Sequence, residues 1–241
     1  HPMCSNYRPV TDVDRLLTFF GVDKEPGETT APEVWPLGLA PFIRAAEEGS
    51  GNKRVDDGLF GMIASFAKEL AYGRKTYNAR SETVHETVTF KGAWAKGWRC
   101  IIPAECIYEP CYETGKAVRW RIQGIGGSPL GVAGIYRPWK APDGRMLWTF
   151  SMLTVNGEGH PVFKRMHRPE DEKRMVLILS PDKYDDWLGC SVEEARRYFK
   201  QWAGPLETFA EPLPPRAPKA SSVRTTRPRR EDQGSFDGLD G

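Results

Sequence analysis

Short apolar segments recur along most of this chain, and Gly, Pro or Asp bounds nearly all of them. Segments of this length and punctuation are typical of β-strands. We therefore expect strands at residues 34–37, 42–46, 59–64, 100–103, 106–112, 118–122, 130–136, 146–155 and 175–179. They do not alternate regularly with helices, as they would in a parallel βαβ sheet. The pattern favours an α+β fold in which a few helices flank a mixed or barrel-like β-sheet core.

Helical patterns are few and short. We expect helices at residues 11–20, 85–96, 181–188 and 191–202. Thr11 can cap the first helix and Gly21 can end it, while Ser191 and Glu194 have the spacing of a capping box. Between the first and second expected helices, residues 72–82 form a long irregular stretch. Such loops inside a domain are usually functional or disordered.

The length and composition indicate one globular domain. Hydrophobic residues make up 39% of the 241 residues and charged residues 27%. We interpret residues 1–3 as a remnant of an expression vector followed by the natural initiator Met3, and residues 4–212 as a single domain. From residue 213 to 241 the chain is rich in Pro and Arg, and we expect an extended, partly disordered tail, although residues 221–226 could add an edge strand.

Several classes of protein and site are not expected. No apolar run approaches the ~18 residues of a membrane-spanning helix, and the first residues contain no secretory signal, so we expect a cytoplasmic protein. The five cysteines are odd in number and fit no common zinc pattern, so we expect neither a metal nor a cofactor. With 34 basic and 32 acidic residues, any nucleic-acid surface must be a local patch.

Cys4 follows the expected initiator methionine directly. One interpretation is an ordinary cysteine near a terminus. The other is that removal of the preceding residues leaves an N-terminal cysteine, whose α-amine has a pKa near ~8 against ~10.4 for lysine. Such an amine can form a Schiff base with an aldehyde, and the adjacent thiol can then close a five-membered ring.

Four further side chains have a possible chemical role beside an ordinary one. Asn78 either caps the local backbone or orients a backbone or substrate oxygen. Arg80 is either a solvated charge or binds a phosphate through the paired N–H donors of its guanidinium group. Glu109 shares a strand face with Ile107, which indicates a partly buried carboxylate in an ion pair or in a site. His167 is either a surface residue or the best general acid or base among the four histidines.

Four blocks in one order carry a resemblance to a known family. The blocks are Met3-Cys4; residues 77–83 (Tyr-Asn-Ala-Arg-Ser-Glu-Thr); residues 99–104 (Arg-Cys-Ile-Ile-Pro-Ala) with Tyr108 and Glu109; and His167 followed by residues 174–179 (Arg-Met-Val-Leu-Ile-Leu). The chain resembles the SOS-response-associated peptidase (SRAP) family of abasic-site-processing proteins over nearly all of residues 3–226.

The resemblance implies a function and a set of residues for it. In this family the methionine is removed autocatalytically, and the exposed cysteine forms a thiazolidine with the ring-opened abasic site of single-stranded DNA. Cys4 matches that nucleophile. The residues matching those that position the amine, move protons and open the sugar are Asn78, Glu109 and His167. Those matching DNA-contacting positions are Arg80, Arg174 and Phe66.

The chain also departs from the family pattern. Ser5 and Asn6 replace a common Gly-Arg pair, so Arg8 is the candidate for a DNA-contacting arginine near the terminus. An insertion separates His167 from Arg174. We expect a monomer that acts on abasic single-stranded DNA, without membrane contact, near the nucleoid during DNA damage. Two alternatives stay open, a cysteine hydrolase that cleaves peptides in trans and a non-covalent single-strand binder.

Overall fold

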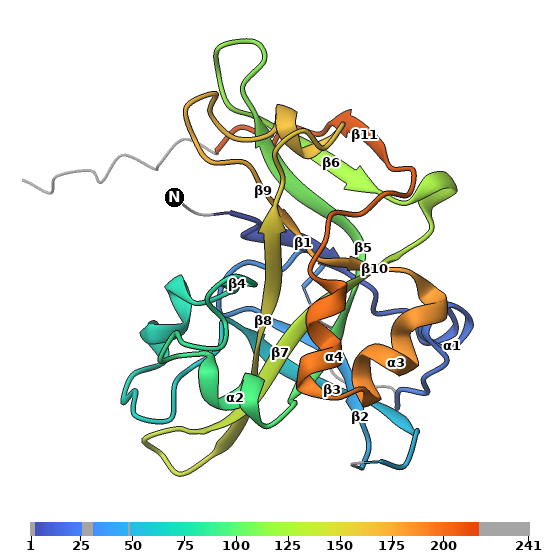
Figure 1. Ribbon diagram of the computed structural model, residues 1–241. Helices are drawn as coiled ribbons and strands as arrows, with labels where there is room; N and C mark the ends of the chain where they lie inside the picture. The colour runs from blue at the N-terminus through green and yellow to red at the C-terminus, as the bar shows by residue number, and fades with distance from the viewer. Residues whose placement is uncertain (1–2, 26–30, 48, 217–241) are drawn as a thin grey trace, which may run out of the picture.

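Five strands close into a barrel at the centre of the computed structural model, which describes residues 3–25, 31–47 and 49–216. In order around the ring they are β2 (Leu39–Ala45), β3 (Lys53–Phe60), β8 (Met146–Asn156), β7 (Leu130–Lys140) and β5 (Arg99–Cys111). Pairing of β5 with both β2 and β7 closes the ring, and only the β3–β8 pair within it is parallel. The expected α+β fold with a mixed, barrel-like core is confirmed (Figure 1).

Six shorter strands extend this ring. They are β1 (Asn6–Pro9), β4 (Asn78–Arg80), β6 (Val118–Gln123), β9 (Arg174–Val176), β10 (Ile178–Leu179) and β11 (Glu207–Ala210). β1 pairs with β5, both β4 and β9 pair with β8, and β10 pairs with β7. β6 and β11 continue the sheet from the far half of β5. These additions bring the first residues of the chain beside the end of β5.

Aromatic side chains fill the barrel. Phe42, Phe60 and Phe150 are fully buried. The rings of Phe42 and Phe60 lie 5.6 and 5.7 Å from the ring of Phe150, and Tyr7 of β1 meets Phe60 edge-on at 5.2 Å. A barrel of this size has room only for packed side chains. The interior is therefore a rigid core, and chemistry must take place at its rim.

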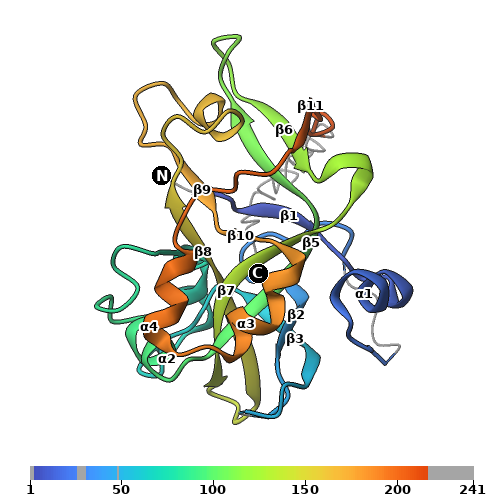
Figure 2. The same ribbon diagram turned by 45° about the vertical axis from the view of Figure 1, so that its right-hand side comes forward.

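The helices are short and lie outside the barrel. They are α1 (Val13–Phe20), α2 (Lys91–Ala95), α3 (Tyr184–Gly189) and α4 (Val192–Ala195). Short 3-10 turns lie at Leu70–Lys75, Ile125–Gly127, Phe163–Arg165, Pro181–Lys183 and Arg196–Tyr198. Figure 2 shows α3 and α4 together beside the barrel and α1 standing apart. Among the described residues no helix is long and apolar enough to cross a membrane.

The helix caps are mostly as expected. Gly21 ends α1 in the left-handed conformation, with φ 65°, and Ser191 and Glu194 form a capping box at α4. The expected cap at Thr11 is wrong, because the side chain of Asp12 accepts the hydrogen bond from the Arg15 N–H. The expected helices at 85–96 and 191–202 are shortened, to α2 and to α4 with its following 3-10 turn.

Several strand boundaries differ from the prediction. Residues 34–37 form no strand, because Leu37 has a φ of 71° and only Val34 makes a bridge, with Tyr7. The strand expected at 59–64 ends at Phe60 instead. Residues 100–103 and 106–112 belong to one continuous strand, β5, and 175–179 are divided between β9 and β10. The irregular stretch 72–82 contains β4, and β11 was not predicted.

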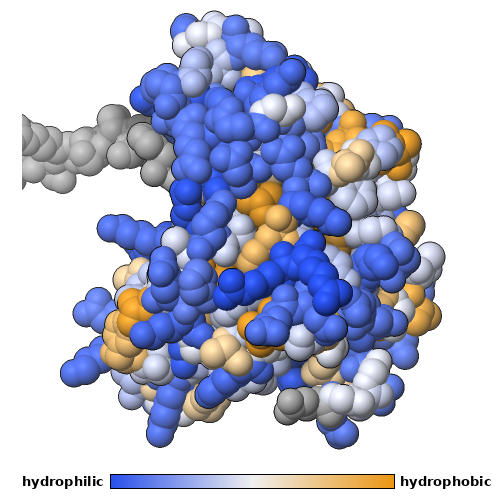
Figure 3. Space-filling model, viewed as in Figure 1, coloured by the Kyte–Doolittle hydropathy of each residue, from blue (hydrophilic) through white to orange (hydrophobic). Residues whose placement is uncertain are grey.

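The surface is largely polar. Figure 3 shows hydrophilic side chains over most of the face seen in Figure 1, with hydrophobic surface in smaller patches. Residues 213–216 of the expected tail contain neither helix nor strand. The rest of that tail, with the edge strand considered at 221–226, lies outside the described residues.

Candidate functional site

Cys4 lies at the rim of the barrel, two residues before β1. The antiparallel register of β1 on β5 pairs Asn6 with Tyr108, which brings Cys4 beside the residue that follows Tyr108. That residue is Glu109, and its Oε1 accepts a hydrogen bond of 3.0 Å from the backbone nitrogen of Cys4. The thiol lies 3.9 Å from the sulfur of Met152 on β8 and is almost completely buried. The strand register thus sets the nitrogen of Cys4 against a carboxylate.

Glu109 connects Cys4 to His167. Its second oxygen, Oε2, lies 2.9 Å from Nε2 of His167, at the distance of an ion pair. The Nε2–H is not aligned for a good hydrogen bond, so charge carries the contact. Both side chains are nearly inaccessible, at 3% and 5% exposure. The partly buried carboxylate expected at Glu109 is therefore present, and each of its oxygens has its own partner.

His167 occupies an unusual backbone position. It has a φ of 64°, in the left-handed region that side chains rarely adopt, and its N–H donates to the Pro110 oxygen at 2.6 Å. Burial is the strongest single influence and lowers the pKa of His167, but the charge of Glu109, its contact with the imidazole and the charge of Asp171 together raise the pKa by more, so the net pKa is above the ordinary value for histidine. The imidazole therefore keeps its proton more readily at neutral pH than a free histidine does.

Asn78 comes to the same place from β4. The pairing of β4 with β8 puts Asn78 beside Met152, and its Nδ2 lies 3.5 Å from the carbonyl oxygen of Cys4. The same Nδ2 donates to the Tyr77 oxygen at 3.1 Å. The side-chain oxygen of Asn78 is buried and has no hydrogen-bond partner among the described residues. That oxygen can accept a hydrogen bond from a donor that enters the site.

Burial of the site changes the pKa values of its side chains. Burial raises the pKa of the Cys4 thiol well above its ordinary value, and the Glu109 carboxylate raises it further. Burial, helped by the charges of Cys4 and Glu109, also raises the pKa of Tyr77 to about 12. At neutral pH the thiol and the phenol are both protonated. The carboxylate of Glu109 and the imidazole of His167 are the groups able to exchange protons there.

The residues expected to contact DNA have different surroundings. Arg80 follows Asn78 on the same face of β4 and is half exposed, but both its terminal nitrogens bind Glu172 at 2.9 Å. Arg174 is buried, and its guanidinium binds Glu82 at 2.7 and 2.8 Å. Phe66 is exposed and Arg8 is half-buried on β1. Neither glutamate partner is apparent from the sequence, because each lies far from its arginine along the chain.

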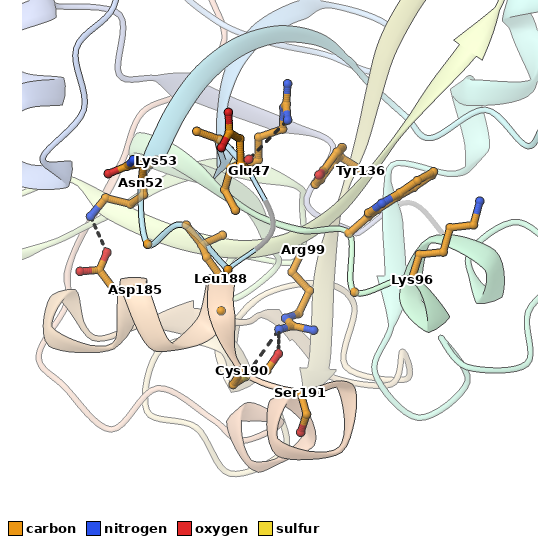
Figure 4. Close-up of a pocket in the computed structure, with 18 of the residues that line it drawn as sticks. Glu47, Asn52, Lys53, Lys96, Arg99, Tyr136, Asp185, Leu188, Cys190 and Ser191 are labelled. Atoms are coloured by element: carbon orange, nitrogen blue, oxygen red, sulfur yellow. Dashed lines mark hydrogen bonds and ion pairs between the residues drawn. The ribbon is translucent and has the colours of Figure 1, made fainter.

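Two cavities bear on the location of the site. One, of about 520 Å³, has Glu109, Asn6, Tyr108 and Trp35 in its wall, so it adjoins the site. Another, of about 610 Å³, is shown in Figure 4. Its wall contains none of the residues that the sequence analysis proposed for catalysis or DNA contact. There Lys53 pairs with Asp185, and Arg99 donates to the carbonyl of Cys190.

Comparisons with known proteins agree with this arrangement. Residues 3–212 match the model of the SOS response associated peptidase (SRAP) family. This chain belongs to the SRAP family. The resemblance inferred from the four sequence blocks is thereby confirmed, and the elements that bring Cys4, Asn78, Glu109 and His167 together all lie within the matched SRAP region.

Similar proteins come from several organisms. The abasic site processing protein YoqW of Bacillus subtilis is 26% identical over 187 residues, which cover 77% of this chain and 80% of YoqW. The abasic site processing protein HMCES of Gallus gallus is 27% identical over 206 residues, covering 74% of this chain and 57% of HMCES. A crystal structure from Bordetella bronchiseptica is 36% identical with a TM-score of 0.80, covering 87% of this chain and 100% of that one.

Proposed function

We propose that this chain captures abasic sites in single-stranded DNA covalently, through Cys4, after the residues that precede Cys4 are removed. The observation that carries the proposal is the contact from the Cys4 nitrogen to Glu109, at 3.0 Å, and from Glu109 to His167, at 2.9 Å. Once Cys4 is the first residue, this nitrogen is an α-amine held against a carboxylate. The names of YoqW and HMCES support a substrate that contains abasic sites.

The proposed reaction has two stages. Hydrolysis of the Met3–Cys4 bond, carried out by the chain on itself, consumes one water and frees the amine. The amine then attacks the aldehyde carbon of the ring-opened abasic sugar, and loss of one water gives an imine. The thiol sulfur of Cys4 adds to the imine carbon, and the thiol proton goes to the nitrogen. The product is a five-membered thiazolidine in which the sugar is bound through nitrogen and sulfur.

The other side chains have distinct tasks in this scheme. His167, whose pKa is raised, is the general acid that protonates the sugar oxygen as the ring opens. Glu109 positions the amine and accepts its proton. The unpaired oxygen of Asn78 accepts a second hydrogen bond from the amine. Because all three groups are fixed before substrate arrives, little ordering is needed in the reaction.

Contacts to DNA follow from the same geometry. We propose that Arg80 holds the phosphate next to the lesion, since it lies two residues along β4 from Asn78 on the same face. Phe66 offers an exposed ring on which a base can stack, and Arg8 adds positive charge from β1. Arg174 can reach a phosphate only by releasing Glu82, so its contribution depends on that exchange.

Peptide cleavage in trans is less compatible with the site. The Cys4 side chain is almost fully buried, and its thiol has a raised pKa, whereas a hydrolase needs an accessible thiolate. A foreign peptide would also have to displace the chain's own first residues.

An intact-mass experiment tests the proposal. A chain that begins at Met3 is incubated with a single-stranded oligonucleotide containing one abasic site, and its denatured mass is recorded. We expect loss of methionine and an adduct equal to protein plus oligonucleotide minus one water. We also expect that retaining His1 and Pro2 slows or prevents the processing.

Two controls make the result specific. An oligonucleotide with a reduced abasic site has no aldehyde and should give no adduct, and a Cys4→Ala variant should give none with either strand. An adduct that forms equally well with Cys4→Ala would overturn the assignment of Cys4. If the parent chain keeps its methionine and forms no adduct, the alternative of a non-covalent single-strand binder is favoured. The complex of such a binder with DNA would dissociate at high salt.

A further inference from the structure

Lys173 has a buried ammonium group for which the proposed chemistry has no use. The residue is 8% exposed, and Nζ lies 2.8, 3.4 and 2.7 Å from the carbonyl oxygens of Met166, His167 and Arg168. A lysine ammonium has three donors and no acceptor, so it matches three converging carbonyls. We propose that Lys173 is a positioning residue that holds His167 in the conformation facing Glu109. The proposal rests on the proposed function where it concerns reaction rate.

The backbone of His167 needs such support. Among the described residues only Leu37 and His167 have a positive φ without being glycine. This conformation is unfavourable for a side-chain-bearing residue and persists only where surrounding contacts impose it. The contacts here are the His167 N–H to Pro110 and the three carbonyls gathered by Lys173. Without the ammonium, the three carbonyl oxygens would lose the donor group that they share, and the Arg168 oxygen would keep its hydrogen bond from the Asp171 N–H at 3.1 Å.

Lys173 is itself held firmly. Its N–H donates to Oε1 of Glu158 at 3.1 Å, and its carbonyl accepts from the Gly157 N–H at 2.7 Å. The next residue, Arg174, begins β9 and pairs with Asn156 of β8. The side chain of Lys173 therefore ties the loop that carries His167 to a strand of the barrel. Lys173, which makes these hydrogen bonds, is the last residue of the insertion that separates His167 from Arg174.

The charge of Lys173 acts on His167 as well. The groups that act on the imidazole are Glu109 and Asp171, which raise its pKa, and Lys173, which lowers it together with burial. Removing the ammonium without moving the imidazole would therefore raise the pKa of His167. If Lys173 holds His167 against Glu109, its removal also releases the imidazole from the carboxylate, and the pKa falls back toward the ordinary histidine value. The direction of the shift thus separates positioning from an effect of charge alone.

The experiment compares variants of the full chain. Lys173→Met removes the charge and the donors, Lys173→Gln keeps two donors without the charge, and Lys173→Arg keeps the charge. Lys164→Met is the matched control, since Lys164 is exposed and lies on the same segment of chain as His167, on its other side from Lys173. The His167 ring is titrated by NMR, and its signal is identified by its absence in His167→Gln. Crosslinking rates are measured over the same pH range.

We expect His167 in Lys173→Met to titrate at lower pH than in the parent, and this variant to crosslink at least about tenfold more slowly. Lys173→Arg should titrate near the parent, and Lys164→Met should match the parent in both measurements. If Lys173→Met does not fold, Lys173→Gln decides, and its His167 must also titrate at lower pH. A His167 titration at or above that of the parent in the neutral variants overturns the proposal. If the parent chain forms no adduct, the proposed function fails, yet the titration still decides the role of Lys173.

Discussion

Glu109 is the residue on which the site depends most, because each of its oxygens serves a different partner. A carboxylate at 3% exposure is tolerated only when it is paired. In Glu109→Gln the amide oxygen can still accept from the Cys4 N–H, but the amide carries no negative charge with which to pair a protonated His167. We expect a loss of about 3 kcal/mol in the free energy of unfolding by urea, together with loss of crosslinking.

Glu105 provides the matched control for that change. It lies on the same strand, β5, and pairs with Arg15 at 2.7 Å in a more exposed setting. Glu105→Gln should cost less than about 1 kcal/mol, as partly exposed ion pairs usually do. Equal losses in the two variants would show that burial of Glu109 has no special energetic role.

The His167 pair also predicts how stability depends on pH. The pKa of His167 is raised in the folded protein, so its protonation stabilises the fold. This stabilisation is complete below the ordinary histidine pKa of ~6.5 and is lost as pH rises through the folded-state pKa. The free energy of unfolding should therefore fall as the pH rises from about 6.5 through the folded-state pKa of His167, and fall less in His167→Gln. Urea denaturation of the parent and of His167→Gln over this pH range measures both free energies of unfolding. An equal decline in the two proteins would contradict the assignment to His167.

At the scale of elements, the closure of the barrel depends on a glycine in β7. Gly134 lies between Cys100 of β5 and Met152 of β8. A Cβ at Gly134 would come within 2.5 Å of Ile102 Cδ1 and of the Ser151 carbonyl oxygen. Because that oxygen belongs to a strand, it cannot move aside without disturbing the ladder. The β5–β7 contact therefore requires a residue without a side chain.

We expect Gly134→Ala to lower the free energy of unfolding by about 2 kcal/mol or more. Gly92→Ala is the control, because Gly92 lies in α2 and its Cβ would meet nothing within 4 Å. That change should be neutral or slightly stabilising, since alanine favours a helix over glycine. Thermal unfolding of the two variants beside the parent measures the difference, and equal midpoints would contradict the barrel-closure argument.

The sequence predicts element types better than their ends. Local patterns locate β7, β8 and α3, since apolar runs and turn residues act over a few positions. They do not show that Leu37 adopts a positive φ, nor that β5 runs unbroken from Arg99 to Cys111. Those features depend on neighbours distant in the chain, namely β1, β6 and β7.

The same limit applies to the site. Cys4, Asn78, Glu109 and His167 were singled out by residue type and family pattern, and the fold brings all four together. Lys173 could not be found in this way, because its role depends on three carbonyls that converge only after folding. Residue type identifies chemistry, whereas positioning contacts become visible only in three dimensions.

At the scale of the whole molecule, charge is nearly balanced, with 34 basic and 32 acidic residues. Affinity for a DNA strand must then come from the few cations near the site. Arg80 is one of them, but both terminal nitrogens of its guanidinium group already bind the Glu172 carboxylate at 2.9 Å. In the proposed function a phosphate replaces that carboxylate, and because both side chains are half exposed the exchange costs little.

The balance between Arg80 and Glu172 gives a test of the DNA surface. Glu172→Gln should tighten binding of an abasic-analogue single strand several-fold at low salt, and Arg80→Gln should weaken it and reduce the salt dependence by about one phosphate contact. Asp143→Asn is the control, because it removes one negative charge from an exposed pair with Arg145 on the turn between β7 and β8. Fluorescence anisotropy over a range of salt concentrations measures all four affinities. If Glu172→Gln binds no better than Asp143→Asn, bulk charge sets the affinity and Arg80 is not a phosphate contact.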